Sequence, residues 1–88
     1  MREKQRISRI LTLFQEIWEC QQDVRFNQLV SNLQYLYSEQ HNEYGKRPVI
    51  IRDGINDVSI HYLDFFYLED DEWEEFLKAY LQELKENK

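Results

Sequence analysis

The chain has 88 residues and a formal net charge of −6, and 42% of its residues are hydrophobic. This composition suffices for the core of one small domain and argues against a disordered chain, and the acidity argues against broad nucleic-acid binding. No apolar run approaches the roughly 20 residues that span a membrane, and a single cysteine, Cys20, excludes an intrachain disulfide, so we expect a cytoplasmic protein without membrane contact.

The first predicted element is an amphipathic helix over about residues 4–20. Its apolar stripe recurs at the i, i+3, i+4 and i+7 spacing of one helical face: Ile7, Ile10, Leu11, Phe14, Ile17 and Trp18. Leu13 lies off this stripe and is expected at its edge or in solvent. The first nine residues contain four cations and one acid: Arg2, Lys4, Arg6, Arg9 and Glu3. The cations are either solvated or paired with the acidic start of the third helix, in the same chain or in a second one.

The second amphipathic helix is predicted over about residues 24–40, with Asp23 as its N-cap. Its apolar stripe is Phe26, Leu29, Val30, Leu33, Leu36 and Tyr37. The short link that precedes it favours an antiparallel hairpin of the first two helices. Arg25, Gln28 and Asn32 share a polar face beside this stripe. They form either a structural network, in which Arg25 pairs with an acid at position 64, 69 or 70, or a partner-binding face.

Residues 42–69 connect the second helix to the third and contain both glycines and the only proline. Two β-branched runs, Val49–Ile51 and Val58–Ile60, flank the turn-rich sequence DGIND. This pattern predicts a short β-hairpin within a longer loop. Because an isolated hairpin is marginal in water, it must lie on the helices or pair with something else.

The third helix is predicted over about residues 71–86. Its apolar stripe is Trp73, Phe76, Leu77, Tyr80, Leu81 and Leu84. Asp70 or Asp71 can cap its first turn, and the glutamates that follow lie where the helix dipole favours negative charge. Three stripes of equal length predict a mainly α fold in a single domain, 1–88. We expect three amphipathic helices packed as a small bundle, with the hairpin inserted between the second and third.

The segment that leads into the third helix is the main candidate for a partner-binding site. Its four consecutive apolar residues, from Phe65 to Leu68, cannot all face one side, so at least one aromatic ring stays partly exposed. Exposed aromatic rings beside charged groups are common in binding surfaces. The candidate partner-binding residues are Arg25, Gln28, Asn32, Asp64, Phe65, Phe66, Tyr67, Glu69, Asp70 and Asp71.

Two motifs stand together in the chain: DVRFNQLVSNL, which begins at Asp23 and follows Trp18, and DFFYLEDDE, which begins at Asp64. With them the chain resembles a family of small bacterial and phage or prophage proteins without an assigned function. That family carries W…DxR[FL]xQLxxN and DxFYxED[DE] motifs. The chain departs from it at Asn27, where the family often has glycine, and in a longer linker between the motifs. The resemblance implies a bacterial or mobile-element setting and no particular activity.

Signals for catalysis or metal binding are sparse. A calcium loop needs oxygens at alternating positions around a glycine, whereas the acids at 69–75 are nearly contiguous. His41 and His61 fall in no metal motif of known spacing, and Cys20 has no basic motif beside it. We therefore expect no catalytic residue, no metal and no cofactor.

The sequence favours a non-enzymatic protein-interaction or regulatory module whose protein partner it does not identify. The alternative is a nucleic-acid mimic, in which carboxylates imitate phosphates, or a nucleic-acid-associated protein, although binding to nucleic acid itself is not expected. The basic N-terminus and the acidic last third are complementary, and a hairpin edge can pair across a twofold axis. Both features would allow a homodimer.

Overall fold

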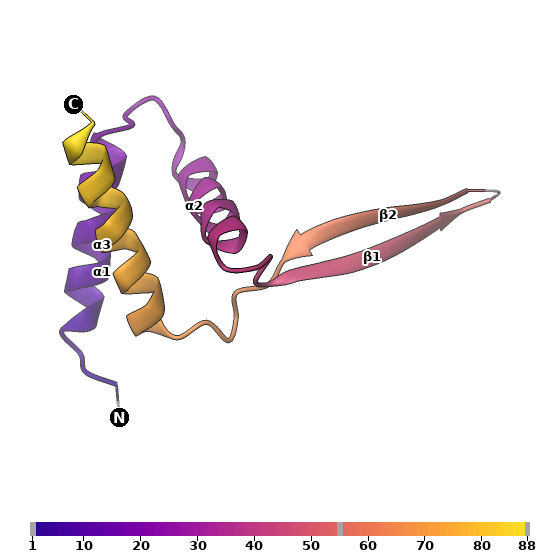
Figure 1. Ribbon diagram of the computed structural model, residues 1–88, viewed down its shortest axis with the longest axis horizontal. Helices are drawn as coiled ribbons and strands as arrows, with labels where there is room; N and C mark the ends of the chain where they lie inside the picture. The colour runs from indigo at the N-terminus through magenta and orange to yellow at the C-terminus, as the bar shows by residue number, and fades with distance from the viewer. Residues whose placement is uncertain (1, 55, 88) are drawn as a thin grey trace. The chain divides into compact units, whose positions relative to one another are not determined.

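The computed structural model describes residues 2–54 and 56–87 and contains three α-helices and one antiparallel hairpin (Figure 1). The elements follow the order α1 (Arg6–Glu19), α2 (Phe26–Gln40), β1 (Lys46–Asp53), β2 (Asn56–Leu63) and α3 (Asp70–Glu86). The predicted helices and the hairpin between the second and third are confirmed. Within the described residues, no helix is long and apolar enough to cross a membrane.

The chain divides into two compact units. Unit 1 comprises Met1–Leu29 with Leu68–Lys88, and unit 2 comprises Val30–Tyr67. Helix α2 contributes its first residues to unit 1 and the rest to unit 2. The single domain expected over 1–88 stays a prediction.

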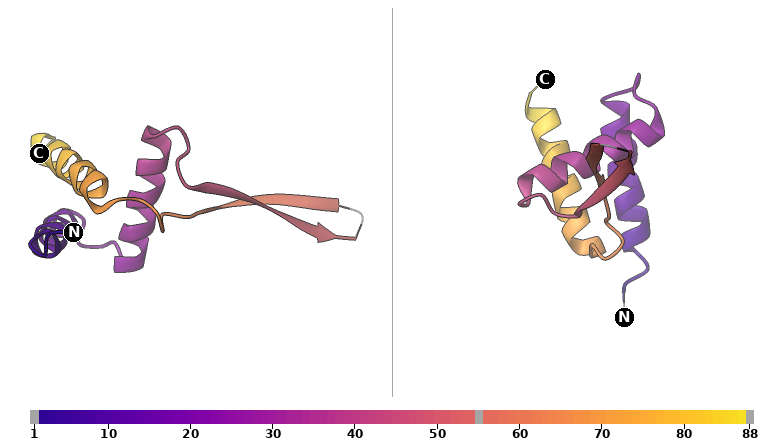
Figure 2. Two further views of the ribbon diagram at one scale, coloured as in Figure 1. Left: turned by 90° about the horizontal axis from the view of Figure 1, so that it is seen from below. Right: turned by 90° about the vertical axis from the view of Figure 1, so that its right-hand side faces the viewer.

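In unit 1, α1 and α3 lie side by side and run parallel (Figures 1 and 2). Their ion pairs advance in the same direction along both helices: Arg6 with Asp70, Arg9 with Glu74 and Glu16 with Lys85. The close helix pair therefore joins the first and last helices, whereas the sequence had favoured a hairpin of the first two. Two parallel neighbours need a long connection, which the intervening chain supplies.

The core of unit 1 confirms one predicted stripe and corrects another. Its buried hydrophobic residues are Ile17, Leu29, Phe76, Leu77 and Leu81. Every member of the α3 stripe is buried or half-buried. On α1, Leu13 is half-buried, whereas Ile7 and Leu11 are 50% and 63% exposed. The predicted stripe is wider than the part of α1 that packs against α3. The packed part lies on the side of α1 that includes Leu13.

Both ends of α2 are closed by local hydrogen bonds, and the predicted cap is wrong. The helix begins at Phe26, beyond the reach of Asp23 as an N-cap. Instead the Arg25 backbone N–H donates to Gln28 Oε1 at 3.0 Å, which is the glutamine half of a capping box. At the other end, the Glu43 N–H donates to the Ser38 carbonyl at 2.8 Å, and Asn42 has a φ of 56°. These are the marks of a Schellman-type helix end.

Gly45 closes the base of the hairpin in unit 2. The register pairs Lys46 with Leu63, and the Asp64 N–H extends the ladder by donating to the Gly45 carbonyl at 2.8 Å. Gly45 has a φ of 79°, and a Cβ there would lie 2.9 Å from both the Asp64 oxygen and the Phe65 ring. Only glycine combines this left-handed backbone with so close an approach. Beyond this point the two strands twist around each other (Figure 2).

We expect Gly45→Ala to destabilise unit 2 more than Gly54→Ala. Both glycines have positive φ, which costs another residue roughly 1–2 kcal/mol, but a Cβ at Gly54 meets nothing within 4 Å. The added loss at Gly45 is the steric overlap with Asp64 and Phe65. Amide hydrogen exchange of the strand residues measures both variants, and equal losses of protection would contradict the steric account.

Candidate functional site

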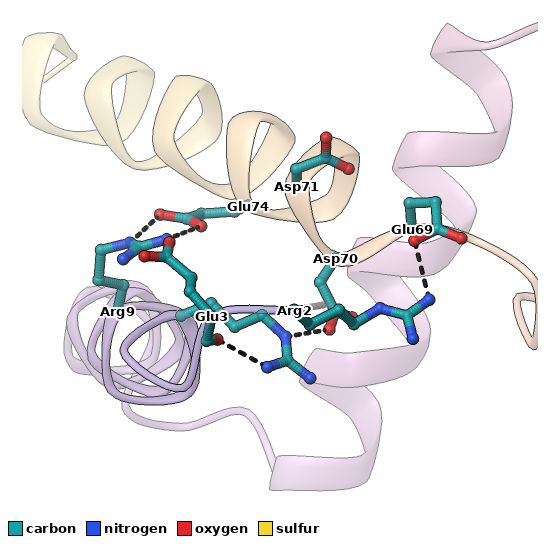
Figure 3. A pocket seen from close by; sticks show the side chains of 8 residues that line it. Arg2, Glu3, Arg9, Glu69, Asp70, Asp71 and Glu74 are labelled. Atoms are coloured by element: carbon teal, nitrogen blue, oxygen red, sulfur yellow. Dashed lines mark hydrogen bonds and ion pairs between the residues drawn. The ribbon is translucent and has the colours of Figure 1, made fainter.

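The acidic start of α3 is bound by arginines from the start of the chain (Figure 3). Arg2 donates to Glu69 at 2.9 Å, and Arg6 donates to Asp70 at 2.6 Å. Arg9 donates to Glu74 at 2.8 Å. Of the alternatives that the sequence left open for the N-terminal cations, pairing within the same chain is therefore the one seen for these three arginines.

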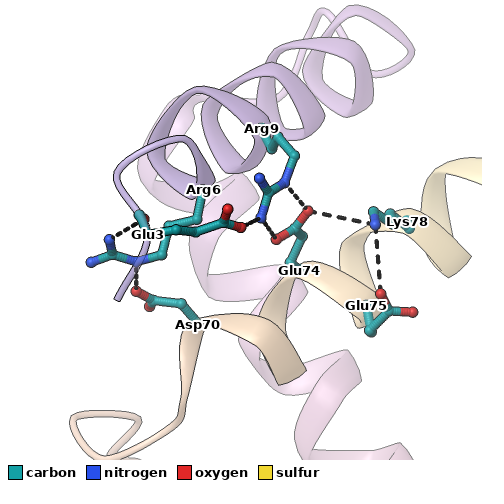
Figure 4. A network of polar contacts seen from close by, with 7 residues as sticks. All are labelled: Glu3, Arg6, Arg9, Asp70, Glu74, Glu75 and Lys78. Carbon is teal, nitrogen blue, oxygen red and sulfur yellow. Dashed lines mark hydrogen bonds and ion pairs between the residues drawn. The ribbon is translucent and has the colours of Figure 1, made fainter. Parts of the chain in front are cut away.

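These pairs explain an unusual feature of α1. Its first turn contains no acid, although negative charge is favoured at a helix N-terminus. Arginines near that end are unfavourable for the dipole of α1 itself, but parallel packing brings the α3 acids beside them. Glu3 joins the cluster by accepting from Arg9, and its backbone oxygen accepts from Arg6 at 2.7 Å (Figure 4).

Glu74 is the one carboxylate of this cluster that is buried, with 5% of its surface exposed. Arg9 binds both of its oxygens, at 2.8 and 3.1 Å, and Lys78 lies 3.5 Å away on the next turn (Figure 4). The hydrogen bond from Arg9 lowers the pKa of Glu74 against the opposing effect of burial. The sequence predicts Glu74 at the positive end of the helix dipole and in an i,i+4 pair with Lys78, but it does not predict that Glu74 is buried. Its position, three and seven residues before Leu77 and Leu81, was the available signal that it lies beside the core stripe.

A pocket of about 270 Å³ lies among these charges (Figure 3). It is lined by Arg2, Glu3, Arg6, Arg9, Glu69, Asp70, Asp71 and Glu74. All of these acids except Asp71 are paired with an arginine, and Asp71 accepts the Glu72 backbone N–H at 2.9 Å. Because its charged groups bind one another, the pocket is best described as the ion-pair cluster that joins the starts of α1 and α3.

The predicted polar face of α2 lies at the surface. Arg25, Gln28 and Asn32 are all exposed, and Gln28 caps the helix. Pairing of Arg25 with Glu69 or Asp70 is not seen among the described residues: the arginines that contact these acids are Arg2 and Arg6. The third predicted acid, at position 64, lies 4.0 Å from Arg47 instead.

The aromatic lead-in separates into a packed ring and two exposed rings. Phe65 is half-buried and packs edge-on against Tyr37 and Tyr44, with ring centroids 5.6 and 5.5 Å apart. Phe66 and Tyr67 are 82% and 79% exposed. The expectation that at least one aromatic stays exposed is therefore confirmed.

One face of the hairpin is an apolar surface that the sequence analysis did not single out. The register places five apolar residues on the same face: Val49, Ile51, Val58, Ile60 and Tyr62. All but Val49 are between 45% and 50% exposed. The alternation of apolar and polar residues in β2, from Val58 to Tyr62, was the available signal. It shows which residues share a face and not whether anything covers that face.

The remaining candidates for chemistry are the two histidines and the cysteine. His41 stacks on the Tyr37 ring at 3.8 Å, and its Nδ1 lies 2.8 Å from the Tyr37 carbonyl oxygen. His61 is exposed on β2, and Cys20 is an exposed free thiol. In the part of the chain that the structure describes, no three His, Cys, Asp or Glu residues are grouped to hold a metal ion.

Comparison with known proteins found no relative of this chain. No family model matches it, and neither a curated protein nor a solved structure matches it significantly. The resemblance to small bacterial and phage proteins therefore depends on the two motifs alone and stays a prediction.

We expect Arg9→Gln to lower the melting temperature of unit 1 at neutral pH more than Arg2→Gln. Arg9 binds the buried Glu74, whereas the side chains of the Arg2–Glu69 pair are 63% and 58% exposed. Exposed pairs contribute little to stability. Thermal unfolding of the two variants provides the comparison, and equal losses would contradict a special role for the buried carboxylate.

The Arg9→Gln effect should also depend on pH. Because the folded pKa of Glu74 is lowered, the pair stabilises the fold above the ordinary glutamate pKa of about 4.3, and this contribution is lost as pH falls through the folded pKa. The difference in melting temperature between wild type and Arg9→Gln should therefore shrink in acid. A difference that stays constant down to about pH 2, below the usual range of carboxyl pKa values, would contradict this linkage.

Proposed function

We propose that this chain is a non-enzymatic protein-interaction module, cytoplasmic and of bacterial or phage origin, with Phe66 and Tyr67 at the centre of its partner-binding surface. The observation that carries the proposal is the exposure of these two rings, 82% and 79%. Among the described residues, they are the most exposed large hydrophobic side chains. Aromatic residues of this kind are enriched where binding energy concentrates in protein interfaces.

The local structure favours binding by these two rings. Asp64 Oδ1 accepts the Phe66 backbone N–H at 3.1 Å, which forms an Asx turn, and the neighbouring Phe65 is anchored among tyrosines. The Phe66 and Tyr67 rings contact each other edge-on, with centroids 5.0 Å apart. Rings that are already oriented lose less conformational entropy when a partner binds them.

The acids predicted for the same surface support this role less. Glu69 and Asp70 are bound by arginines, and a partner that used them would have to break those pairs. The same pairing weakens the alternative of a nucleic-acid mimic, which needs free carboxylates.

Packing of all three helices as one bundle remains part of the proposal, and the burial of Leu29 at the start of α2 supports it.

The proposal is tested by affinity capture from a bacterial lysate, with bound proteins quantified by mass spectrometry. We compare wild type, the double variant Phe66→Ala/Tyr67→Ala, and Tyr35→Ala, which alters another half-exposed ring in unit 2. Because the altered rings are exposed, each change should shift the free energy of unfolding by no more than about 0.5 kcal/mol.

We expect the double variant to lose a protein that wild type and Tyr35→Ala both retain. Direct titration of that purified protein against the three forms should then show binding to wild type and to Tyr35→Ala only. Identical sets of captured proteins for all three forms would contradict the proposed surface.

A further inference from the structure

The two outer edges of the hairpin can be assigned from its hydrogen bonds. The Asp64 N–H donates to the Gly45 carbonyl, so these two residues form a hydrogen-bonded pair. In an antiparallel ladder such pairs alternate with non-bonded pairs. With the observed register, odd-numbered residues of β1 and even-numbered residues of β2 point their backbone groups at each other. Even-numbered residues of β1 and odd-numbered residues of β2 therefore point theirs to the outer edges.

The outer edge of β1 is protected against pairing with another strand. Pro48 is one of its outward-pointing residues and has no N–H to donate. Lys46 and Arg52 occupy outward positions on either side of it. Proline and cations on an edge strand are the usual means by which proteins prevent edge-to-edge association.

The outer edge of β2 has none of these features. Its sequence, NDVSIHYL, contains no proline, lysine or arginine. Its outward-pointing residues are Asp57, Ser59, His61 and Leu63. Each has a backbone N–H and carbonyl directed outward, and within the described residues no third strand pairs with them. The β1 edge is thus protected against pairing with another strand, and the β2 edge is open to it.

We propose that the open edge of β2 binds β2 of a second copy of this chain, antiparallel about a twofold axis at Ser59. The product is a four-stranded sheet in the order β1, β2, β2, β1. A two-stranded hairpin with one apolar face is marginally stable in water, and additional strands stabilise it. The protected β1 edges stop the sheet from growing further.

The residues of β2 are complementary to themselves in this register. With Ser59 opposite its own copy, Asp57 lies opposite His61, and the imidazole N–H can donate to the carboxylate. On the apolar face, Val58 lies opposite Ile60, in the non-hydrogen-bonded position where cross-strand side chains approach most closely. Each of these pairs occurs twice because of the symmetry. A register centred on Asp57 would instead oppose two like charges.

Proline substitution tests the edge with a matched control. The Ser59 N–H points outward, so Ser59→Pro removes a donor that makes no bond within the hairpin. The backbone N–H of its register partner Ile50 also points outward, on the β1 edge. Ile50→Pro should therefore perturb the hairpin to the same extent while leaving the β2 edge intact. Sedimentation over a concentration series should show wild type and Ile50→Pro reaching twice the 11.0 kDa chain mass. Ser59→Pro should stay at the single mass.

A disulfide trap measures the register without proline. In a Cys20→Ser background, Ser59→Cys should form an interchain disulfide on mild oxidation, because hydrogen-bonded pairs have Cα atoms about 5.5 Å apart, within the range that a disulfide spans. Ile50→Cys in the same background should not.

The proposal is overturned if wild type stays monomeric at every concentration, if Ser59→Pro associates as wild type does, or if the two cysteine variants cross-link equally. Phe66→Ala/Tyr67→Ala should dimerise like wild type. Dimerisation therefore tests the β2 edge, and loss of a captured protein tests the surface at Phe66 and Tyr67. Either proposal can fail without the other.

Discussion

The bond between Arg9 and Glu74 is the constraint on which the arrangement of unit 1 depends. Parallel neighbours place two positive helix ends side by side, which is unfavourable unless charged groups compensate. Here α1 supplies arginines and α3 supplies acids, and the pairs connect the two starts. The buried Glu74 makes the match specific, because a buried carboxylate is costly unless a cation and hydrogen bonds satisfy it.

Because Glu69 and Asp70 pair with arginines of the same chain, less of the segment before α3 is available to bind a partner. In the sequence, the acidic run and the aromatic residues before it form one segment. In the structure, Glu69 and Asp70 are paired with Arg2 and Arg6 within unit 1. Phe65 packs with Tyr37 and Tyr44, and Phe66 and Tyr67 remain exposed. The surface that a partner could reach is thus smaller and more apolar than the motif indicates.

The two edges of the hairpin differ in how well they are protected against pairing with another strand. Its apolar face has no cover within the hairpin itself, and pairing with another strand would add cross-strand contacts between apolar side chains on that face. Pro48 lies at an outward position on β1, where its missing N–H costs the hairpin nothing and blocks that edge. The unprotected β2 edge is therefore the element most suited to bind another strand.

Local patterns in the sequence determined the secondary structure. Helical spacing predicted the three helices to within two residues at each end, and two β-branched runs around DGIND predicted the hairpin, because periodicity and turn chemistry act over a few residues. Only the tertiary structure decided that α1 pairs with α3, that Leu13 and not Leu11 lies toward the core, and that Glu74 is buried on Arg9. Those outcomes depend on contacts between residues about sixty positions apart in the sequence. A carboxylate can face solvent, a second chain or an arginine, and the residues next to it in the sequence do not determine which.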